Sequence, residues 1–275
     1  MNNKTHPLRG ITDQRVSVCM PYRNRLKEFQ VTAQGLLAQR PDEIVIVDDA
    51  SNDGSEEWLP HGFALTCKRA GIDFIYKRLV DTGYKRYPLE AFNSCMSLAT
   101  GDILIQQSPE VAHLNHVIAG LVIALAWPDD NDESRNEHTA FARVLDAPLL
   151  WVASLPPFGA YKRTAGLKGL DGLSWDERQG IIKQHTLPVL TEQSRFPVQA
   201  GQIRLYTGQE RPMPFFFCGA IYKSLWVEMN GYDLTGDYNR EWGADAEFAK
   251  RLLHRGSRIH GLGSCIACHI QHGRS

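Results

Sequence analysis

Residues 16–55 read VSVCMPYRNRLKEFQVTAQGLLAQRPDEIVIVDDASNDGS, and this stretch decides the fold class of the chain. It opens with Val16–Met20, a short apolar run of the kind that forms a buried strand. Apolar residues then recur at roughly helical spacing from Asn24 to Gln39. The β-branched run Glu43–Asp49 ends in two carboxylates, and the Asn, Asp and Gly residues that follow it favour a turn. This order of segments predicts a βαβ unit with parallel strands.

The same alternation continues toward the middle of the chain. A strand is predicted at Phe74–Arg78, and a helix at Pro88–Thr100, with a proline in its first turn and Gly101 just past its end. Asp102–Gln107 has the composition of a fourth strand. Ligands of such sheets bind beyond the carboxyl ends of the strands. A site is therefore expected from the residues that follow those ends: Pro21–Arg25, Asp48–Ser51, Lys77–Arg86 and Gln107–His113.

Regular patterning is interrupted in the middle of the chain and then returns. Val117–Trp127 reads as a buried helix, but residues 128–211 show no sustained period and predict a loop-rich insertion. Asp245–Arg255 predicts a helix closed by Gly256, with a strand after it. The whole chain, residues 1–275, is therefore predicted to form one α/β domain in which helices flank a mostly parallel central sheet.

The composition argues against several classes of protein. Lys plus Arg total 30 and Asp plus Glu total 31, a formal net charge of −1, which argues against a broadly cationic nucleic-acid-binding surface. No run approaches the roughly 18 apolar residues of a membrane span. Residues 1–15 lack the apolar core of a secretory signal. The six cysteines are then expected to be reduced thiols. We expect a cytoplasmic protein and leave peripheral membrane contact open.

Two acidic clusters follow predicted strands. Asp48 and Asp49 either belong to a solvated turn or hydrogen-bond the ribose or base of a nucleotide, as acids at strand ends do in nucleotide sites. In QQSPEVAH, residues 106–113, Glu110 and His113 would share one face of a helical first turn. A carboxylate and an imidazole so placed suit Mn²⁺ or another divalent ion. The plainer alternative is a proline-started helix with a glutamate near its N-terminus.

The last third of the chain offers two more candidates. Asp245 is either an acid at a helix N-terminus or a general base that takes a proton from an acceptor hydroxyl, with Glu241 as the backup carboxylate. The tract Cys265–His272 holds two Cys and two His, but their spacing is too tight for a common zinc finger. One His that donates to a metal held by other parts of the chain is the favoured interpretation.

Several catalytic motifs are missing from the sequence. It contains no phosphate-loop pattern and no GxGxxG dinucleotide fingerprint. The GxSxG nucleophile elbow is missing as well. These absences argue against the common NTPase, dehydrogenase and hydrolase classes of parallel α/β proteins.

Taken together, these segments resemble the family 2 glycosyltransferases of the GT-A fold. Residues 16–55 are similar to the opening signature of that family, a strand, a Pro-aromatic turn, a helix and a strand that ends in two Asp residues. DTGYKRYPLEAFNSCMSLATGDILIQQSPE, residues 81–110, resembles its next block. PFFFCGAIYKSLWVEMNGYD and EWGADAEFAKRLLHRG, from residues 214 and 241, resemble its acceptor side. The resemblance implies a nucleotide-sugar-binding half at 15–113 and an acceptor-side half at 212–272, separated by the insertion.

Two motifs depart from the usual family pattern. In place of the Asp-x-Asp metal motif, QQSPEVAH resembles a variant with the pattern Gln-x-Pro-Glu-x-x-His. The acceptor motif reads Gly-Ala-Asp, so that Asp245 lacks the usual acidic neighbour.

The resemblance implies a reaction and a set of site residues. The chain would move a sugar from a nucleotide-sugar, with a UDP-linked donor as the first expectation, to a hydroxyl acceptor such as a saccharide. Transfer would invert the anomeric carbon and use Mn²⁺ or Mg²⁺, and bacterial polysaccharide or glycoconjugate synthesis is the expected setting. By this resemblance Asp245 would be the catalytic base, and Glu110 would bind the metal together with His269 or His272. Gln107 would contact the donor sugar, and Lys85 and Arg86 would bind the diphosphate. The nucleoside would be bound by Pro21, Tyr22, Arg23, Asp48 and Asp49.

Rival interpretations remain beside this one. Lys85 and Arg86 also read as a solvated surface pair. The altered motifs suit a GT-A domain that has lost catalysis and only binds a glycan or a nucleotide-sugar. A sugar-nucleotide pyrophosphorylase is a third option, but it calls for a Gly-rich loop after the first strand, and PYRNRLKEF contains no glycine.

Overall fold

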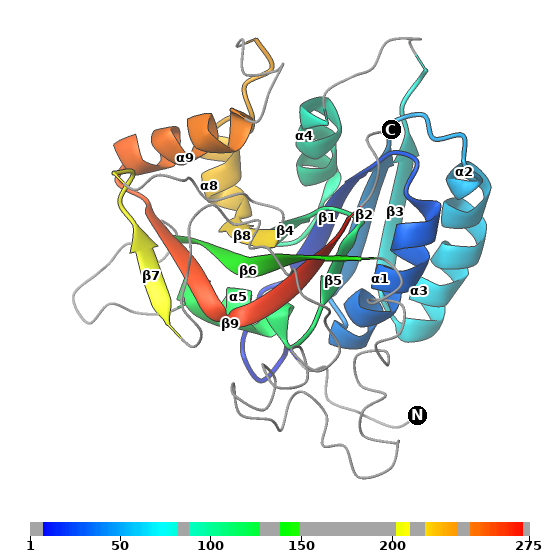
Figure 1. The fold of residues 1–275 in the computed structure, drawn as a ribbon, viewed down its shortest axis with the longest axis horizontal. Helices are drawn as coiled ribbons and strands as arrows, with labels where there is room; N and C mark the ends of the chain where they lie inside the picture. The colour runs from blue at the N-terminus through cyan, green and yellow to red at the C-terminus, as the bar shows by residue number, and fades with distance from the viewer. Residues whose placement is uncertain are drawn as a thin grey trace.

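The computed structural model describes residues 8–81, 88–126, 138–148, 202–209, 218–235 and 243–271. Within these residues, nine strands form one sheet in the order β3-β2-β1-β4-β8-β6-β9-β5, with β7 paired to β9 (Figure 1). The strands are β1 (Val16–Tyr22), β2 (Glu43–Asp48), β3 (Asp73–Arg78), β4 (Ile103–Gln107), β5 (Val111–His113), β6 (His138–Pro148), β7 (Ile203–Tyr206), β8 (Cys218–Tyr222) and β9 (Arg258–Gln271).

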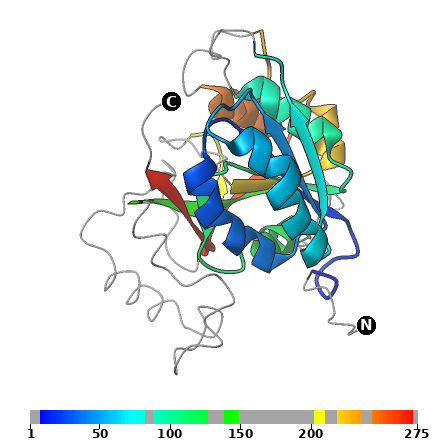
Figure 2. The ribbon, with the colours of Figure 1, turned by 90° about the vertical axis from the view of Figure 1, so that its right-hand side faces the viewer.

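Helices lie on both sides of the sheet. Figure 2 shows helices α1 and α3 in front of the sheet, while Figure 1 shows α4, α8 and α9 above it and α5 below it. The helices are α1 (Leu26–Gln39), α2 (Ser55–Trp58), α3 (Ala64–Ala70), α4 (Leu89–Leu98), α5 (Val117–Ala126), α8 (Lys223–Glu228) and α9 (Ala244–His254), with a π-helical turn at Leu59–Phe63 between α2 and α3.

The first half of the sheet confirms the predicted βαβ pattern. Strands β1 to β4 and helices α1 and α4 coincide with the predicted segments to within a few residues. Helix α1 turns its apolar side chains, among them Phe29 and Leu36, onto the sheet, where both are fully buried. It ends at Arg40, whose positive φ of 51° closes the last turn. The sheet is the core of the protein, because β1, β2 and β4 are buried along their whole length.

Most of the strands point in the same direction. Parallel pairing joins β1 to β2 and β4, β2 to β3, and β6 to β9. Strand β8 is antiparallel to both β4 and β6, so β6 and β9 run in the same direction as β4. Six of the nine described strands (β1, β2, β3, β4, β6 and β9) therefore present their carboxyl ends at one edge of the sheet. The prediction of a mostly parallel central sheet is confirmed.

Two strands come from the segment predicted to be a loop-rich insertion. Strand β6 lies between β8 and β9, and β7 pairs with the first part of β9. Pairing between β6 and β9 shifts register between Ala142 and Arg143, where a bulge lets β9 advance from Leu262 to Ile266. Because β6 is buried on both faces, it shows no alternation of polar and apolar residues. That is why its sequence gave no strand signal.

The prediction of a helix after Gln107 is wrong. The chain turns at Ser108, and Val111–His113 form β5, which pairs antiparallel with the end of β9. A free edge of β9 offers backbone partners there, and the β-branched Val111 suits a strand. Glu110 and His113 consequently do not share a helix face.

His113 is a structural residue of the core. Its Nδ1 lies against the Gln39 amide of α1, and its Nε2 lies 3.7 Å from the Cys218 sulfur of β8. The Gln39 carbonyl in turn accepts the backbone N–H of Ile118 in α5 at 2.8 Å. Burial lowers the pKa of His113 to about 3. A neutral imidazole therefore links β5 to helix α1 and to strand β8.

Two further observations bear on the expected setting. All six cysteines are free and buried. Among the helices of the described ranges, none is both long enough and apolar enough to cross a membrane.

Acidification is expected to destabilise the protein through His113. Its pKa of about 3 in the folded state lies below the ~6.5 of an unfolded chain, so the unfolded state binds more protons between these values. The free energy of unfolding should fall by about 1.4 kcal/mol per pH unit as the pH drops below 6.5. Urea unfolding between pH 7 and pH 5 measures this slope. In His113→Gln the slope should be shallower by that amount, and equal slopes would contradict the assignment.

Candidate functional site

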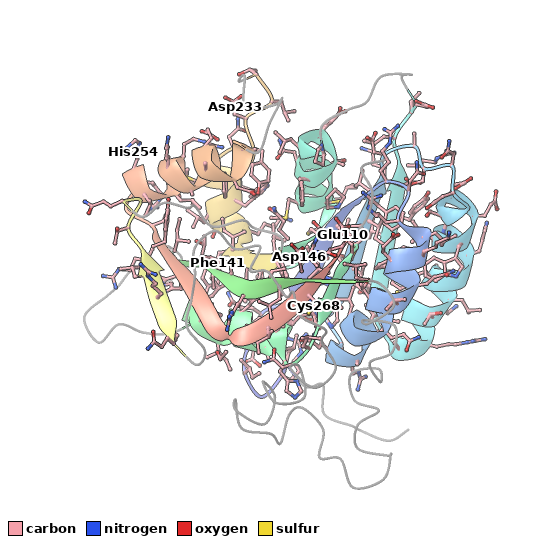
Figure 3. The ribbon with its side chains drawn as sticks, in the orientation of Figure 1. Glu110, Phe141, Asp146, Asp233, His254 and Cys268 are labelled. Atoms are coloured by element: carbon pink, nitrogen blue, oxygen red, sulfur yellow. The ribbon has the colours of Figure 1, made fainter. Side chains whose placement is uncertain are left out.

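The shared carboxyl edge of the sheet brings together three ionisable side chains. Glu110 follows the end of β4, Asp146 lies near the end of β6, and His269 lies near the end of β9. Figure 3 shows Glu110 and Asp146 near one another at this edge. Both acids are less than a tenth exposed. Carboxylates withdrawn from water need a partner of opposite charge or a cation.

Backbone pairing fixes the position of each member of this group. His269 is the register partner of Asp146 across the parallel β6–β9 pair and of Val111 across the antiparallel β5–β9 pair. The Glu110 carbonyl accepts the backbone N–H of Ile270 at 2.9 Å. The hydroxyl of Thr32 in α1 donates to the Pro109 carbonyl at 2.6 Å, which ties down the turn before Glu110. Glu110, Asp146 and His269 therefore form a rigid set.

The imidazole of His269 lies between the two acids. Its Nδ1 is 3.0 Å from Asp146 Oδ1, and its Nε2 is 3.5 Å from Glu110 Oε1. When Nδ1–H donates to Asp146, the Nε2 lone pair points at a carboxylate, and like lone pairs repel. Either a proton on Nε2 or a cation between Nε2 and Glu110 removes this repulsion. The arrangement is thus built for a positive charge at that point.

A metal held here would have few protein ligands. Across the described ranges, no group of three or more His, Cys, Asp or Glu side chains is placed to hold a metal ion. Glu110 and His269 are the two donors, and Asp146 acts through the imidazole as the partner that fixes its tautomer. Asp146 was missed by sequence reasoning, because no motif surrounds it and its contact partner is 123 residues away.

Two neighbours complete the surroundings of Glu110. Arg25 Nε lies 4.0 Å from Glu110 Oε2, and the side chain of Arg25 is mostly buried. Gln107 donates its amide to the Val111 carbonyl at 3.1 Å. Its Oε1 is buried and has no hydrogen-bond partner among the residues that the structure describes. A buried acceptor of this kind is suited to a hydroxyl group of a ligand.

At the end of β2, Asp48 organises a loop. It is fully buried, its Oδ1 accepts the backbone N–H of Ser51 at 2.9 Å, and its Oδ2 accepts the Tyr76 hydroxyl at 2.9 Å. Arg78 Nε is 3.7 Å from the same Oδ2, and its guanidinium also donates to the Ser51 carbonyl at 2.8 Å. These contacts hold the backbone from Asp48 to Ser51 in place.

The other residues of the predicted nucleoside site lie on the neighbouring strand and loop. Arg23 donates to Asp49 Oδ2 at 3.0 Å and is a third exposed. Pro21 and Tyr22 are the last two residues of β1, and both are buried. The Tyr22 hydroxyl is 2.9 Å from that of Ser55, and burial raises the pKa of this phenol. Of this group, Arg23 is the side chain that reaches solvent.

Asp245 lies in the first turn of helix α9, near the predicted helix start, and contacts a buried phenol. The Tyr232 hydroxyl lies 3.2 Å from Asp245 Oδ1 and 2.8 Å from Gln106 Oε1. Gln106 belongs to β4, directly before Gln107. Burial and the Asp245 charge raise the pKa of Tyr232, so the phenol stays protonated and donates. The predicted base is thereby joined to the same strand end that carries Gln107.

Some predicted residues lie outside the described part of the chain. They are Lys85, Arg86, His272 and the backup acid Glu241. The diphosphate contacts and the choice between His269 and His272 therefore stay predictions, although His269 is the one that the structure shows beside Glu110.

Comparisons with known proteins point to one group. Residues 17–107 match the model of Glycosyl transferase family 2. These residues, about a third of the chain, run from β1 to the end of β4 and include Asp48, Asp49 and Gln107. A search of curated proteins finds no match to this sequence.

Solved structures resemble the chain over nearly all of its length. A mannosyltransferase from Pyrobaculum calidifontis, in complex with GDP-Man and Mn²⁺, has 15% identity and a TM-score of 0.54 and covers 93% of this chain and 57% of its own. GalNAc-T7 with UDP, GalNAc and Mn²⁺ has 14% identity and a TM-score of 0.58, with coverages of 94% and 44%. TarS of S. aureus with UDP has 15% identity and a TM-score of 0.53, with coverages of 92% and 60%.

The likeness to these structures concerns the fold. The expected GT-A architecture is confirmed, because the same arrangement of helices and strands recurs at low identity. The chain spans between 44% and 60% of the length of these three proteins.

Asp48→Asn is expected to destabilise the protein. The substitution turns an acceptor oxygen that faces Tyr76 and Arg78 into an amide donor in a fully buried position. The free energy of unfolding should fall by about 1–3 kcal/mol, measured by urea denaturation at pH 7. Asp13→Asn, at an exposed position, is the matched control and should stay within about 0.5 kcal/mol of the parent. Equal stabilities for the two variants would contradict the structural role of Asp48.

Proposed function

We propose that this chain is a glycosyltransferase that moves a sugar from a nucleotide-sugar to a hydroxyl acceptor. The observation that carries the proposal is the placement of Glu110 and His269 side by side at the carboxyl edge, 3.5 Å apart. The family match over residues 17–107 and the fold shared with nucleotide-sugar transferases support it. Catalysis would take place where the parallel strands end, as in other open α/β sheets.

The residues present fit a divalent cation. A carboxylate and an imidazole are suitable donors for Mn²⁺, and phosphate oxygens of a substrate complete the coordination in many nucleotide enzymes. Glu110 and His269 would hold the ion, and Asp146 would keep His269 Nδ1 protonated so that Nε2 can donate. When bound, the cation supplies positive charge beside a leaving diphosphate. Lys85 and Arg86 are proposed to supply further positive charge there.

The donor would lie across the ends of β1, β2 and β4. Arg23 and Asp49, with Pro21 and Tyr22 behind them, are proposed to meet the nucleoside. Asp48 would act there by shaping the loop to Ser51, through the contacts described above. The buried Gln107 Oε1 is proposed to accept a hydroxyl of the donor sugar. A UDP-linked donor is the first to test.

Asp245 is proposed to be the general base. An inverting single displacement needs one base, which takes the proton of the acceptor hydroxyl as that oxygen attacks the anomeric carbon and the nucleoside diphosphate departs. No covalent intermediate and no protein nucleophile are required. A protein of this kind would serve polysaccharide or glycoconjugate synthesis, in the cytoplasm or at the periphery of a membrane.

A second candidate function, binding without catalysis, is favoured by two features. No group of three metal-binding side chains occurs within the ranges described above, and the acceptor motif holds one acid where two are usual for the resembled family. These features suit a GT-A domain that binds a nucleotide-sugar or a glycan without turnover. Release of a nucleoside diphosphate distinguishes the two functions.

Nucleotide binding is expected to depend on a divalent cation. Calorimetry with UDP, GDP, dTDP and CMP, in Mn²⁺ and then in EDTA, should show one nucleoside diphosphate binding with Mn²⁺ and losing most of its affinity in EDTA. Glu110→Gln should weaken this binding. Asp146→Asn should weaken it about 10- to 100-fold, because the Nδ1–H tautomer of His269 is then no longer favoured.

The control for this measurement is Glu57→Gln, which changes an exposed acid of α2. It should bind like the parent. Binding of equal strength in Mn²⁺ and EDTA would contradict the metal role of Glu110 and His269. No binding of any nucleotide would contradict the donor site as a whole.

Asp245→Asn is expected to abolish most transfer while leaving donor binding intact. Loss of a general base costs about 100- to 10,000-fold in kcat. Turnover of UDP-glucose, UDP-galactose, UDP-GlcNAc and GDP-mannose is followed by release of the nucleoside diphosphate, with Asp13→Asn as the control. A variant that keeps nearly the full rate would exclude Asp245 as the base.

A further inference from the structure

The hydroxyl of Tyr232 lies between a strand end and the proposed base. It is 2.8 Å from Gln106 Oε1 on β4 and 3.2 Å from Asp245 Oδ1 on α9. Tyr232 itself belongs to the short segment after α8 and is almost completely buried. Strand β4 and helix α9, which are distant in sequence, therefore meet at one oxygen atom.

The position of this hydroxyl is fixed from two sides. The side chain of Asn93 in α4 binds both backbone groups of Tyr232, donating to its carbonyl at 2.8 Å and accepting its N–H at 2.9 Å. The phenol ring packs against the rings of Phe92, Trp226 and Phe248, with centroids 5.8, 5.4 and 5.1 Å away. Such an aromatic cluster leaves the ring few alternative rotamers. The hydroxyl is preorganised.

The proton count decides the direction of the hydrogen bonds. A phenol carries one hydrogen and cannot donate fully to two acceptor oxygens at once. Turning the Gln106 amide by 180° places its NH₂ group against the Tyr232 oxygen, an exchange that leaves the shape of the side chain unchanged. Gln106 then donates to Tyr232, and Tyr232 donates to Asp245. The single phenol proton is then directed at the carboxylate, and the phenol oxygen accepts from Gln106.

We propose that Tyr232 is a positioning residue that orients the carboxylate of Asp245 for proton abstraction. This inference rests on the proposed function, in which Asp245 is the base. With Oδ1 held by the phenol, rotation of the carboxylate about its Cβ–Cγ bond is restricted, and so is the range of directions in which Oδ2 can face an acceptor. Tyr232 touches neither substrate nor metal in this role and acts entirely through Asp245.

The charges around Tyr232 are compatible with a neutral donor. Burial and then the charge of Asp245 raise the pKa of the phenol, whereas the hydrogen bond with Gln106 and the charge of Arg251 in α9 lower it to a smaller extent. Arg251 is itself paired with Glu247 at 2.9 Å, while Gln106 is uncharged. A hydrogen bond donated to a carboxylate favours its charged form and lowers its pKa. Removing the phenol oxygen should therefore raise the pKa of Asp245.

The test is a direct titration of Asp245. Aspartate labelled with ¹³C at the side-chain carboxyl carbon gives one resonance per residue, and the signal missing from Asp245→Asn identifies Asp245. In Tyr232→Phe the pKa of Asp245 should rise by about one, a tenfold change in its ionisation constant. Tyr222→Phe is the matched control, because it removes another buried phenol, which donates to the Leu125 carbonyl at 3.2 Å. This control should leave the titration of Asp245 unchanged.

A second variant covers the case in which Tyr232→Phe does not fold. Asn93→Ser releases the backbone of Tyr232 without touching its hydroxyl, and it should move the pKa of Asp245 in the same direction by a smaller amount. With a donor that the protein turns over, Tyr232→Phe should lower kcat about tenfold at an unchanged KM. Its acidic limb in the pH profile should move upward with the pKa of Asp245.

The outcomes separate this inference from the proposed function. If Tyr232→Phe leaves both the titration of Asp245 and kcat unchanged, Tyr232 is structural and the inference is overturned. If Asp245→Asn retains the transfer rate, Asp245 is not the base, and the positioning role of Tyr232 is excluded as well. If Asp245→Asn loses the rate while Tyr232→Phe shifts the pKa of Asp245 and lowers kcat, both hold.

Discussion

The register of β9 against its neighbours is the constraint on which the candidate site depends. His269 is paired with Asp146 on one side and with Val111, the residue after Glu110, on the other. Side chains of directly paired residues lie on the same face of a sheet, so the register places Asp146 beside His269. Glu110 lies in the turn before β5, and its carbonyl is bound to β9 through the backbone N–H of Ile270. The site residues therefore lie on hydrogen-bonded backbone and not on a flexible loop. The rigidity suits a site that must hold charge at a defined point.

Strand β4 divides the two sides of the proposed reaction. Gln106 and Gln107 are consecutive residues, so their side chains point to opposite faces of the sheet. Gln107 bonds the β5 backbone beside Glu110, whereas Gln106 reaches Tyr232 and through it Asp245. The donor-side carboxylate and the proposed base are thus supported by neighbouring residues of one buried strand. A displacement of that strand would disturb both.

The sequence predicted the parts of the fold that are built from local patterns. Strands β1 to β4 and helices α1, α4 and α9 show regular spacing and clear ends, and Asp245 was correctly placed at the start of α9. The short segment after Glu110 was assigned to a helix, because the edge of β9 that turns it into a strand is more than 150 residues away. Asp146 and Tyr232 escaped notice for the same reason. Their roles come from contacts with distant parts of the chain, and the sequence pattern alone marks neither Asp146 nor the Tyr232 hydroxyl as part of a site.

The register shift between Ala142 and Arg143 determines which β9 residue lies opposite Asp146. Before the bulge, each β6 residue pairs with the β9 residue 120 positions later, as Ala142 does with Leu262, and after it with the residue 123 positions later, as Asp146 does with His269. Without that offset Asp146 would stand opposite Ile266. A one-residue slip would also turn the imidazole to the other face of the sheet. Relatives of this protein should therefore tolerate substitution of Gly263 to Cys265 more readily than any insertion or deletion among them.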